Sequence, residues 1–374
     1  MSEKSAQEPQ LFDLTLTDEQ RMTRESMQRF AETEMRELSR QVDESREIPA
    51  EFFQKANELG ITALAVPEAH GGAGFDRSPV SNVLIAEDLA HGDMALALGV
   101  LAPLGIVNAL RDFGTEAQQA AYLPRFVEEN FYPAVVALDE PRVTFSVREL
   151  QTKAVAQGDG YVLNGVKSAV PLVETAQLFL VLAELEGQGP QAFLVAKDTA
   201  GVTAKAEPFM GLAGLQLGEL KLEEVKLGKD ALLGEGTGFD YTRFLDLHRL
   251  GACAAGLGVA QAVLDHTSVY VNERVAFGEP ISHRQAVAFM VANIAIELES
   301  MRLLVWRAAS RAEHGLDFHR EAHLAYINCC ERLMEIGTNG VQLLGGHGFT
   351  KEYFEEMWYR NLRSVAAVNT GFQL

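Results

Sequence analysis

The sequence predicts an α+β protein that is mostly α-helical, with a β domain placed between two helical domains. Two changes of pattern along the chain predict this order. Apolar residues recur at helical spacing up to about residue 129, short β-branched or alternating runs follow to residue 237, and long apolar helical patterns then return. We therefore predict an N-terminal all-α domain at 1–129, a middle antiparallel β-sheet or barrel domain at 130–237 and a C-terminal domain resembling a four-helix bundle at 238–374.

In the first domain, Thr17 and Gln20 have the spacing of a capping box, which predicts that a helix begins there. Pro49 fits the start of a second helix. The glycine-rich stretch 63–74 lacks the strand and helix that flank a dinucleotide-binding fingerprint, so we interpret it as a loop. Further helices are expected over 80–90, 94–110 and 115–129, the first two so apolar that they belong in the core.

The middle domain contains about seven strand-like runs without intervening helices, separated by turns rich in Gly, Asp and Pro. The runs fall at 131–138, 151–157, 161–163, 177–184, 192–196, 202–206 and 218–225. In the third domain, helical patterns cover 241–272, 285–314 and 321–344, with Gly and Ala at positions that allow close helix packing.

Composition restricts the class of protein. A formal net charge of −20 repels nucleic acid and anionic membranes, so we expect neither as a partner. No uninterrupted apolar run reaches 18 residues, and Met1 to Gln10 lacks the apolar region of a signal peptide, which favours a cytoplasmic location. Three cysteines without CxxC spacing predict neither disulfides nor a metal site.

The stretch 272–285 interrupts two long helical patterns with a polar segment. It brings together Arg274, Phe277 and Gln285 with a glycine and a proline. A guanidinium suits a phosphate, and a flat ring suits stacking, so the stretch favours a nucleotide cofactor. The alternative is a turn between helices with a surface arginine and a buried phenylalanine.

Two blocks of sequence resemble the acyl-CoA dehydrogenase family. Residues 273–285 (ERVAFGEPISHRQ) are similar to its ER-x-x-FG-x-PI-x-x-x-Q signature, and residues 342–349 (QLLGGHGF) to its Q-x-x-GG-x-G segment. Weaker matches lie at 67–74, 114–124 and 160–167. The resemblance covers essentially the whole chain and agrees with the predicted order of domains.

The resemblance implies a flavoprotein with FAD between the β domain and the C-terminal helices. Arg274 would pair with the diphosphate, Phe277 would pack on the adenosine, and Gln285 would bond nearby. Gln342, Gly345 and Gly346 would approach the cofactor of a neighbouring subunit. The resemblance thus implies a homodimer or homotetramer, possible electron-transfer-flavoprotein partnership and a place in fatty acid metabolism.

For the acyl-CoA substrate, the resemblance points to Asp246 and Arg249, which are three residues apart and so share a helix face. It assigns them to the thioester and pantetheine channel. A surface ion pair is the alternative. Substrate depth would depend on side chains around 94–105 and 245–256.

The sequence departs from the family at the position of the base. Most members use a glutamate in a Y-E-G-T run to remove the α-proton of the thioester, whereas here that position is Asn369, which cannot accept a proton. A minority of members place the glutamate at the position that corresponds to His248. The family's L-T-E-P-G-A-G-S-D segment also reads LDEPRVTFS at 138–146, and its I-T-N stretch is replaced near Pro171.

Three hypotheses follow. The protein is an acyl-CoA dehydrogenase with a substitute base, for which His248 is a candidate because imidazole titrates near neutrality. Alternatively, it is a non-catalytic or half-active subunit that pairs with an intact homologue in a heteromer. The third hypothesis is a flavin-dependent monooxygenase, which needs no α-base; the retained diphosphate block makes it the least favoured of the three.

Overall fold

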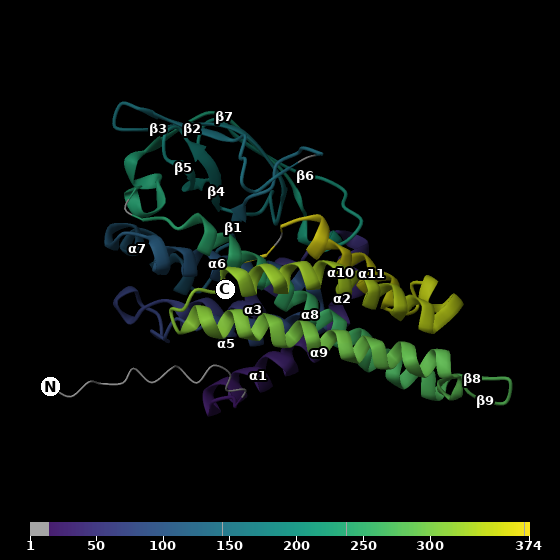
Figure 1. Cartoon of the computed structure of the whole chain (residues 1–374). Helices are drawn as coiled ribbons and strands as arrows, with labels where there is room; N and C mark the ends of the chain where they lie inside the picture. The colour runs from purple at the N-terminus through teal and green to yellow at the C-terminus, as the bar shows by residue number, and fades with distance from the viewer. Residues whose placement is uncertain (1–14, 144, 237, 370) are drawn as a thin grey trace.

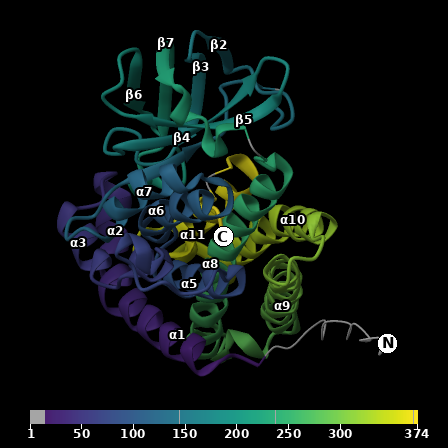
Figure 2. The same ribbon diagram turned by 90° about the vertical axis from the view of Figure 1, so that its left-hand side faces the viewer.

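The computed structural model describes residues 15–143, 145–236, 238–369 and 371–374. The order helical domain, β domain, helical domain is confirmed, and with it the predicted fold class. Both views show the sheet on one side of a helical body that is formed jointly by the first and third domains (Figures 1 and 2). The prediction about Met1 to Gln10 falls outside the described residues.

The N-terminal domain wraps around two buried helices, α5 and α6. Thr17 forms the predicted capping box with Gln20 at the start of α1. The short π-helical segment Ala31–Met35 joins α1 to α2. Nearly every residue of α6 is buried, because it carries apolar side chains on all faces. The helices are α1 (Asp18–Phe30), α2 (Arg36–Ser45), α3 (Ala50–Asn57), α4 (Ile61–Ala65), α5 (Pro79–Gly92), α6 (Met94–Phe113) and α7 (Glu116–Tyr122).

The middle domain is one seven-stranded sheet. The order of its main path is β1-β4-β2-β3-β7-β6, with β5 paired to β4. Most neighbours are antiparallel, as expected, but β4 runs parallel to β1 and to β2. These two pairings join strands distant in sequence, so no hairpin turn fixes their direction. The strands are β1 (Ala134–Ala137), β2 (Lys153–Gln157), β3 (Gly160–Val170), β4 (Leu178–Leu185), β5 (Gly189–Ala196), β6 (Val202–Ala206) and β7 (Gly218–Gly228).

The C-terminal domain is built on α8, whose middle is buried against α5 and α10. Glycines allow this close approach: a Cβ on Gly258 would lie 2.1 Å from the carbonyl oxygen of Glu87 in α5. The elements are α8 (Tyr241–Glu273), β8 (Val275–Ala276), β9 (Glu279–Pro280), α9 (Gln285–Glu313), α10 (His319–Leu344) and α11 (Glu355–Ala367). The hairpin β8–β9 projects beyond the end of the bundle (Figure 1).

Helices α6 and α8 are each long and apolar enough, by length and composition alone, to cross a membrane. Within the fold, however, 94% of the apolar window of α6 and 83% of that of α8 are buried inside the protein. Core helices of globular domains share these properties. Both helices therefore act here as the centre of the helical body, and the start of α8 also lines the candidate site.

Candidate functional site

A cavity of about 1100 Å³ lies between the β domain and the C-terminal helices. Its wall is assembled from the loop after β1, the start of α8, the start of α10 and the end of α11 with the segment that follows, and Pro190 of β5 also contributes. The residues used below are Asp139, Tyr241, Asp246, Arg249, His319, Tyr326 and Asn369. The pair Asp246 and Arg249 and the distant Asn369, all named from the sequence, thus line one space.

Asp139 and Asn369 are bonded to each other in this wall. The side-chain amide of Asn369 donates to Oδ1 of Asp139 over 2.6 Å, and the backbone N–H of Asn369 donates to Oδ2 over 2.8 Å. Burial raises the pKa of Asp139, against the opposing effects of these two bonds and of the charges on Lys167 and Arg249. A carboxylate with a raised pKa is a stronger proton acceptor than an exposed one.

Glu140 and Lys167 hold the segment that carries Asp139. Nζ of Lys167 lies 3.0 Å from Oε1 of Glu140 and donates to the carbonyl oxygen of Leu138, also over 3.0 Å. The lysine side chain is fully buried, and burial lowers the pKa of Lys167 to about 8 although Glu140 opposes the shift. The backbone N–H of Thr152 also donates to Glu140. The pair therefore fixes the loop after β1 against β2 and β3.

Asp246 and Arg249 project from neighbouring turns of α8 into the cavity. Oδ2 of Asp246 lies 2.7 Å from Nδ1 of His319 on α10, and the guanidinium of Arg249 lies over the ring of Tyr326 at 4.5 Å. Burial raises the pKa of Asp246, while His319 and Arg249 act in the opposite direction. Asp246 is buried, which differs from the surface ion pair considered as an alternative.

His248 also belongs to α8, but its side chain is not part of the cavity wall. Its Nε2 lies 3.0 Å from the carbonyl oxygen of Asn369, and its ring stacks on Phe244 with centroids 5.9 Å apart. Complete burial lowers the pKa of His248 to about 4. The neutral imidazole therefore donates a hydrogen bond from Nε2 to the backbone carbonyl oxygen of Asn369.

A second concave site brings together four of the residues assigned to the cofactor. Arg274, Gln342, Gly345 and Gly346 line a cavity of about 340 Å³ at the end of α8 and α10. Gly345 has φ 58° and ψ −128°, a conformation that side chains disfavour, and an added Cβ on Gly345 or Gly346 would meet no atom within 4 Å. The backbone is thus open to a ligand beside a cation, which fits a diphosphate.

Phe277 and Gln285 lie outside the wall of this second cavity. Phe277 stands at the tip of the β8–β9 hairpin, with φ 57° and a side chain that is 98% exposed. Gln285 is the exposed first residue of α9. The predicted alternative of a buried phenylalanine is therefore wrong. A bulky residue in the left-handed region with its ring in solvent is unusual and favours a binding role.

Sequence reasoning did not assign a role to Asp139, His319 or Tyr326. For Asp139 a signal existed, because the stretch LDEP places a carboxylate where the resembled family has a hydroxyl. His319 and Tyr326 carry no local motif, and only the packing of α10 against α8 places them beside Asp246 and Arg249.

Comparison with known proteins is consistent across the chain. Family models described as the N-terminal, middle and C-terminal domains of acyl-CoA dehydrogenase match residues 17–130, 136–225 and 234–369. The mitochondrial short-chain specific acyl-CoA dehydrogenase of Bos taurus is 34% identical over 93% of this chain and 86% of its own.

Solved structures give the same result. Butyryl-CoA dehydrogenase from Megasphaera elsdenii superposes with a TM-score of 0.87 and 30% identity, covering 97% of both chains. A glutaryl-CoA dehydrogenase from Mycobacterium smegmatis in complex with FADH2 superposes with a TM-score of 0.85 and 26% identity, covering 96% of this chain and 92% of that one.

Proposed function

The chain belongs to the acyl-CoA dehydrogenase family, and we propose that it catalyses the α,β-dehydrogenation of an acyl-CoA thioester with FAD as cofactor and Asp139 as the base. The observation that carries this proposal is the buried Asp139 carboxylate in the cavity wall, bonded to the residue at the usual base position. Position 369 has no carboxylate, but Oδ1 of Asp139, in the loop after β1, lies 2.6 Å from the side-chain nitrogen of Asn369.

The residues at the second cavity fit the diphosphate end of FAD. Arg274 would pair with the diphosphate, and Gln342, Gly345 and Gly346 would offer open backbone beside it. The exposed ring of Phe277 would pack on the adenosine, and Gln285 would bond nearby. When bound, FAD supplies an acceptor for the hydride that leaves the β-carbon of the substrate.

Asp139 would take the α-proton. Burial raises the pKa of Asp139 and so strengthens it as a base, while the neighbouring charges of Lys167 and Arg249 favour its ionised form. Asn369 fixes both carboxylate oxygens, so the base is held in one orientation. Our proposal gives His248 a positioning role instead, because its Nε2 holds the carbonyl of Asn369 and its pKa is lowered to about 4.

Asp246 and Arg249 would orient the substrate. Arg249 is a cation in the cavity wall, so its guanidinium can donate to the carbonyl oxygen of the thioester or to a phosphate oxygen of CoA. Asp246 is anchored by His319 and can accept from an amide N–H of a pantetheine arm.

The surface of α9 supports an oligomer. Phe289, Ile296 and Leu303 are exposed apolar residues seven positions apart, and Leu324 and Ile327 of α10 are exposed as well. Such a stripe favours burial against another subunit. We propose a cytoplasmic homodimer or homotetramer that passes electrons to an electron-transfer flavoprotein.

A second candidate function has one observation in its favour. Both oxygens of Asp139 already accept hydrogen bonds from Asn369, which is compatible with a non-catalytic subunit that binds the thioester beside an intact homologue. A flavin-dependent monooxygenase has no comparable support in the geometry of the cavity.

Anaerobic titration separates these functions. The FAD-loaded protein is mixed with straight-chain acyl-CoA thioesters, and the visible absorbance of oxidised flavin is followed. Bleaching by at least one thioester supports the proposed enzyme. Thioester binding without bleaching, together with co-purification of a homologue that carries the usual glutamate, supports the non-catalytic subunit. Absence of both FAD binding and thioester binding contradicts both candidates.

A further inference from the structure

We propose that residues 371–374 form an internal stop that limits the substrate to thioesters with short acyl groups. The inference rests on the proposed function, because it assumes that the thioester binds beside Asp139 and Asn369. It concerns a part of the chain that is separate from the base and from the residues assigned to FAD.

The segment runs into the core between α6 and α8. Phe372 is 1% exposed and Leu374 is 0% exposed. A Cβ on Gly105 of α6 would lie 2.9 Å from the backbone nitrogen of Gln373, and a Cβ on Gly251 of α8 would lie 2.4 Å from the carbonyl oxygen of Phe372. Both views place the C-terminal end of the chain within the helical body (Figures 1 and 2). The two helices therefore have glycine at the positions where the backbone of residues 371–374 passes closest to them.

Side chains of the surrounding helices hold the main chain of the segment. Nδ2 of Asn108 donates to the carbonyl oxygen of Gln373 over 2.9 Å, and Arg77 donates to the carbonyl oxygen of Leu374. The buried amide of Gln373 has no partner among the described residues. The surrounding helices thus bind the backbone carbonyl oxygens and the apolar side chains of this segment. The polar side chain of Gln373 adds no hydrogen bond within the described part of the chain.

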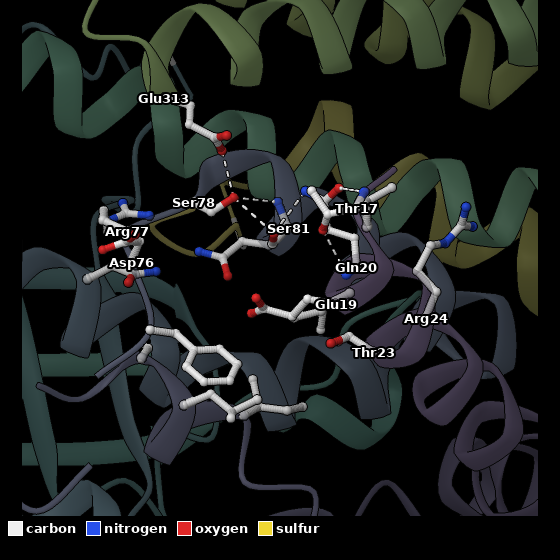
Figure 3. Close-up of a pocket in the computed structure, with 18 of the residues that line it drawn as sticks. Thr17, Glu19, Gln20, Thr23, Arg24, Asp76, Arg77, Ser78, Ser81 and Glu313 are labelled. Carbon is white, nitrogen blue, oxygen red and sulfur yellow. Dashed lines mark hydrogen bonds between the residues drawn. The ribbon is translucent and has the colours of Figure 1, made fainter. Parts of the chain in front are cut away.

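The segment lies between the walls of two different pockets. Asn369, two residues before it, lines the candidate cavity. Asn108 and Arg77, which bond its far end, line a pocket of about 440 Å³ shown in Figure 3, where Arg77 lies across from Glu19 and Gln20 of α1. The segment therefore lies between a polar cavity and a pocket on another side of the helical domain.

With CoA on the wall that carries Asp246 and Arg249, as proposed above, the acyl carbons would extend inward past Asn369. The apolar interior there is the space between α6 and α8, which Phe372 and Leu374 already fill. A short acyl group ends before this obstruction, whereas a longer one would collide with it.

The test compares the affinities of butyryl-CoA and octanoyl-CoA for the FAD-loaded protein by calorimetry. The full chain should bind octanoyl-CoA at least tenfold more weakly than butyryl-CoA. Deletion of residues 371–374 should bring octanoyl-CoA to at least the affinity of butyryl-CoA, because each methylene that gains a buried site adds about fourfold. Phe372→Ala keeps the backbone seat and provides a second variant, with a smaller shift in the same direction. Val155→Ala, on the exposed side of β2, is the control and should leave the ratio unchanged.

Each outcome supports or refutes the proposed stop at residues 371–374. If octanoyl-CoA binds the full chain as tightly as butyryl-CoA, or if both altered tails keep the original ratio, the stop is refuted while the proposed function stands. If neither thioester binds the full chain or either variant, the proposed function fails and the stop fails with it.

Discussion

The side-chain amide of Asn369 donates a hydrogen bond to Oδ1 of Asp139 over 2.6 Å, across 230 residues of sequence. This contact joins the segment after α11 to the loop after β1. In the proposed function, Asn369 occupies the usual position of the base and holds Asp139, which takes over that role.

Asn369→Ala should shift the pH dependence of turnover. The side-chain bond from Asn369 lowers the pKa of Asp139, so its loss lets burial raise that pKa further. Since the base acts above its pKa, the acid limb of the rate should move to higher pH. Flavin bleaching rates measured across pH with a saturating thioester test this. A shift to lower pH would contradict the assignment of Asp139.

Lys167→Met should destabilise the fold by about 3–5 kcal/mol, because it removes the nearest charge partner of the buried Glu140 and, among the described residues, leaves only Arg142, at 4.0 Å. Adding Glu140→Gln to that variant should recover most of the loss. The free energy of unfolding in urea, measured for both variants, provides the check. An equal loss in the single and double variants would show that lost packing, and not the unpaired carboxylate, is the cause.

Arg274→Gln should weaken FAD binding by about tenfold to a hundredfold, as expected for the loss of a charge-assisted bond. The affinity of Arg274→Lys for FAD should lie between those of Arg274→Gln and the original chain. Fluorescence titration of the apoprotein with FAD measures both. Arg332→Gln removes a half-buried arginine of α10 that pairs with Glu335 and with Glu297, away from the second cavity, and is the control. Similar losses for Arg274→Gln and this control would contradict the cofactor site.

His248 should make stability fall as the pH is lowered. Its folded pKa of about 4 lies below the ordinary value of 6.5, so the unfolded chain binds the proton first and stability declines below about pH 6.5. The full effect is about 3 kcal/mol at or below pH 4. In His248→Gln the decline in unfolding free energy between pH 7.5 and pH 4 should be smaller by about that amount. Parallel declines would exclude a buried neutral imidazole.

The regular elements could be predicted from local sequence. The predicted helix 285–314 corresponds to α9, Gln285–Glu313, and the predicted strand 202–206 to β6, because periodicity and turn residues are local signals. The parallel pairing of β1 with β4 could not be predicted, since it depends on contacts between distant segments.

In the candidate site, too, residues with local motifs could be predicted, whereas contacts between distant segments could not. Arg274 and Gly345 carry motifs and could be named from sequence. Asp139 could not be joined to Asn369, because no pattern links positions on different domains. The burial of Phe372 could not be predicted either. It depends on Gly105 and Gly251, which come close to the same segment only when α6 and α8 are packed together.

The central claim is that Asp139 removes the α-proton, and exchange of acetyl-CoA protons tests it most directly. Acetyl-CoA has an α-carbon but no β-carbon, so the FAD-loaded protein in deuterated water can exchange its protons without transferring a hydride. The full chain should incorporate deuterium at the α-carbon, and Asp139→Asn should exchange about a hundredfold more slowly or worse while still binding acetyl-CoA. Equal exchange rates in the two proteins would contradict the account.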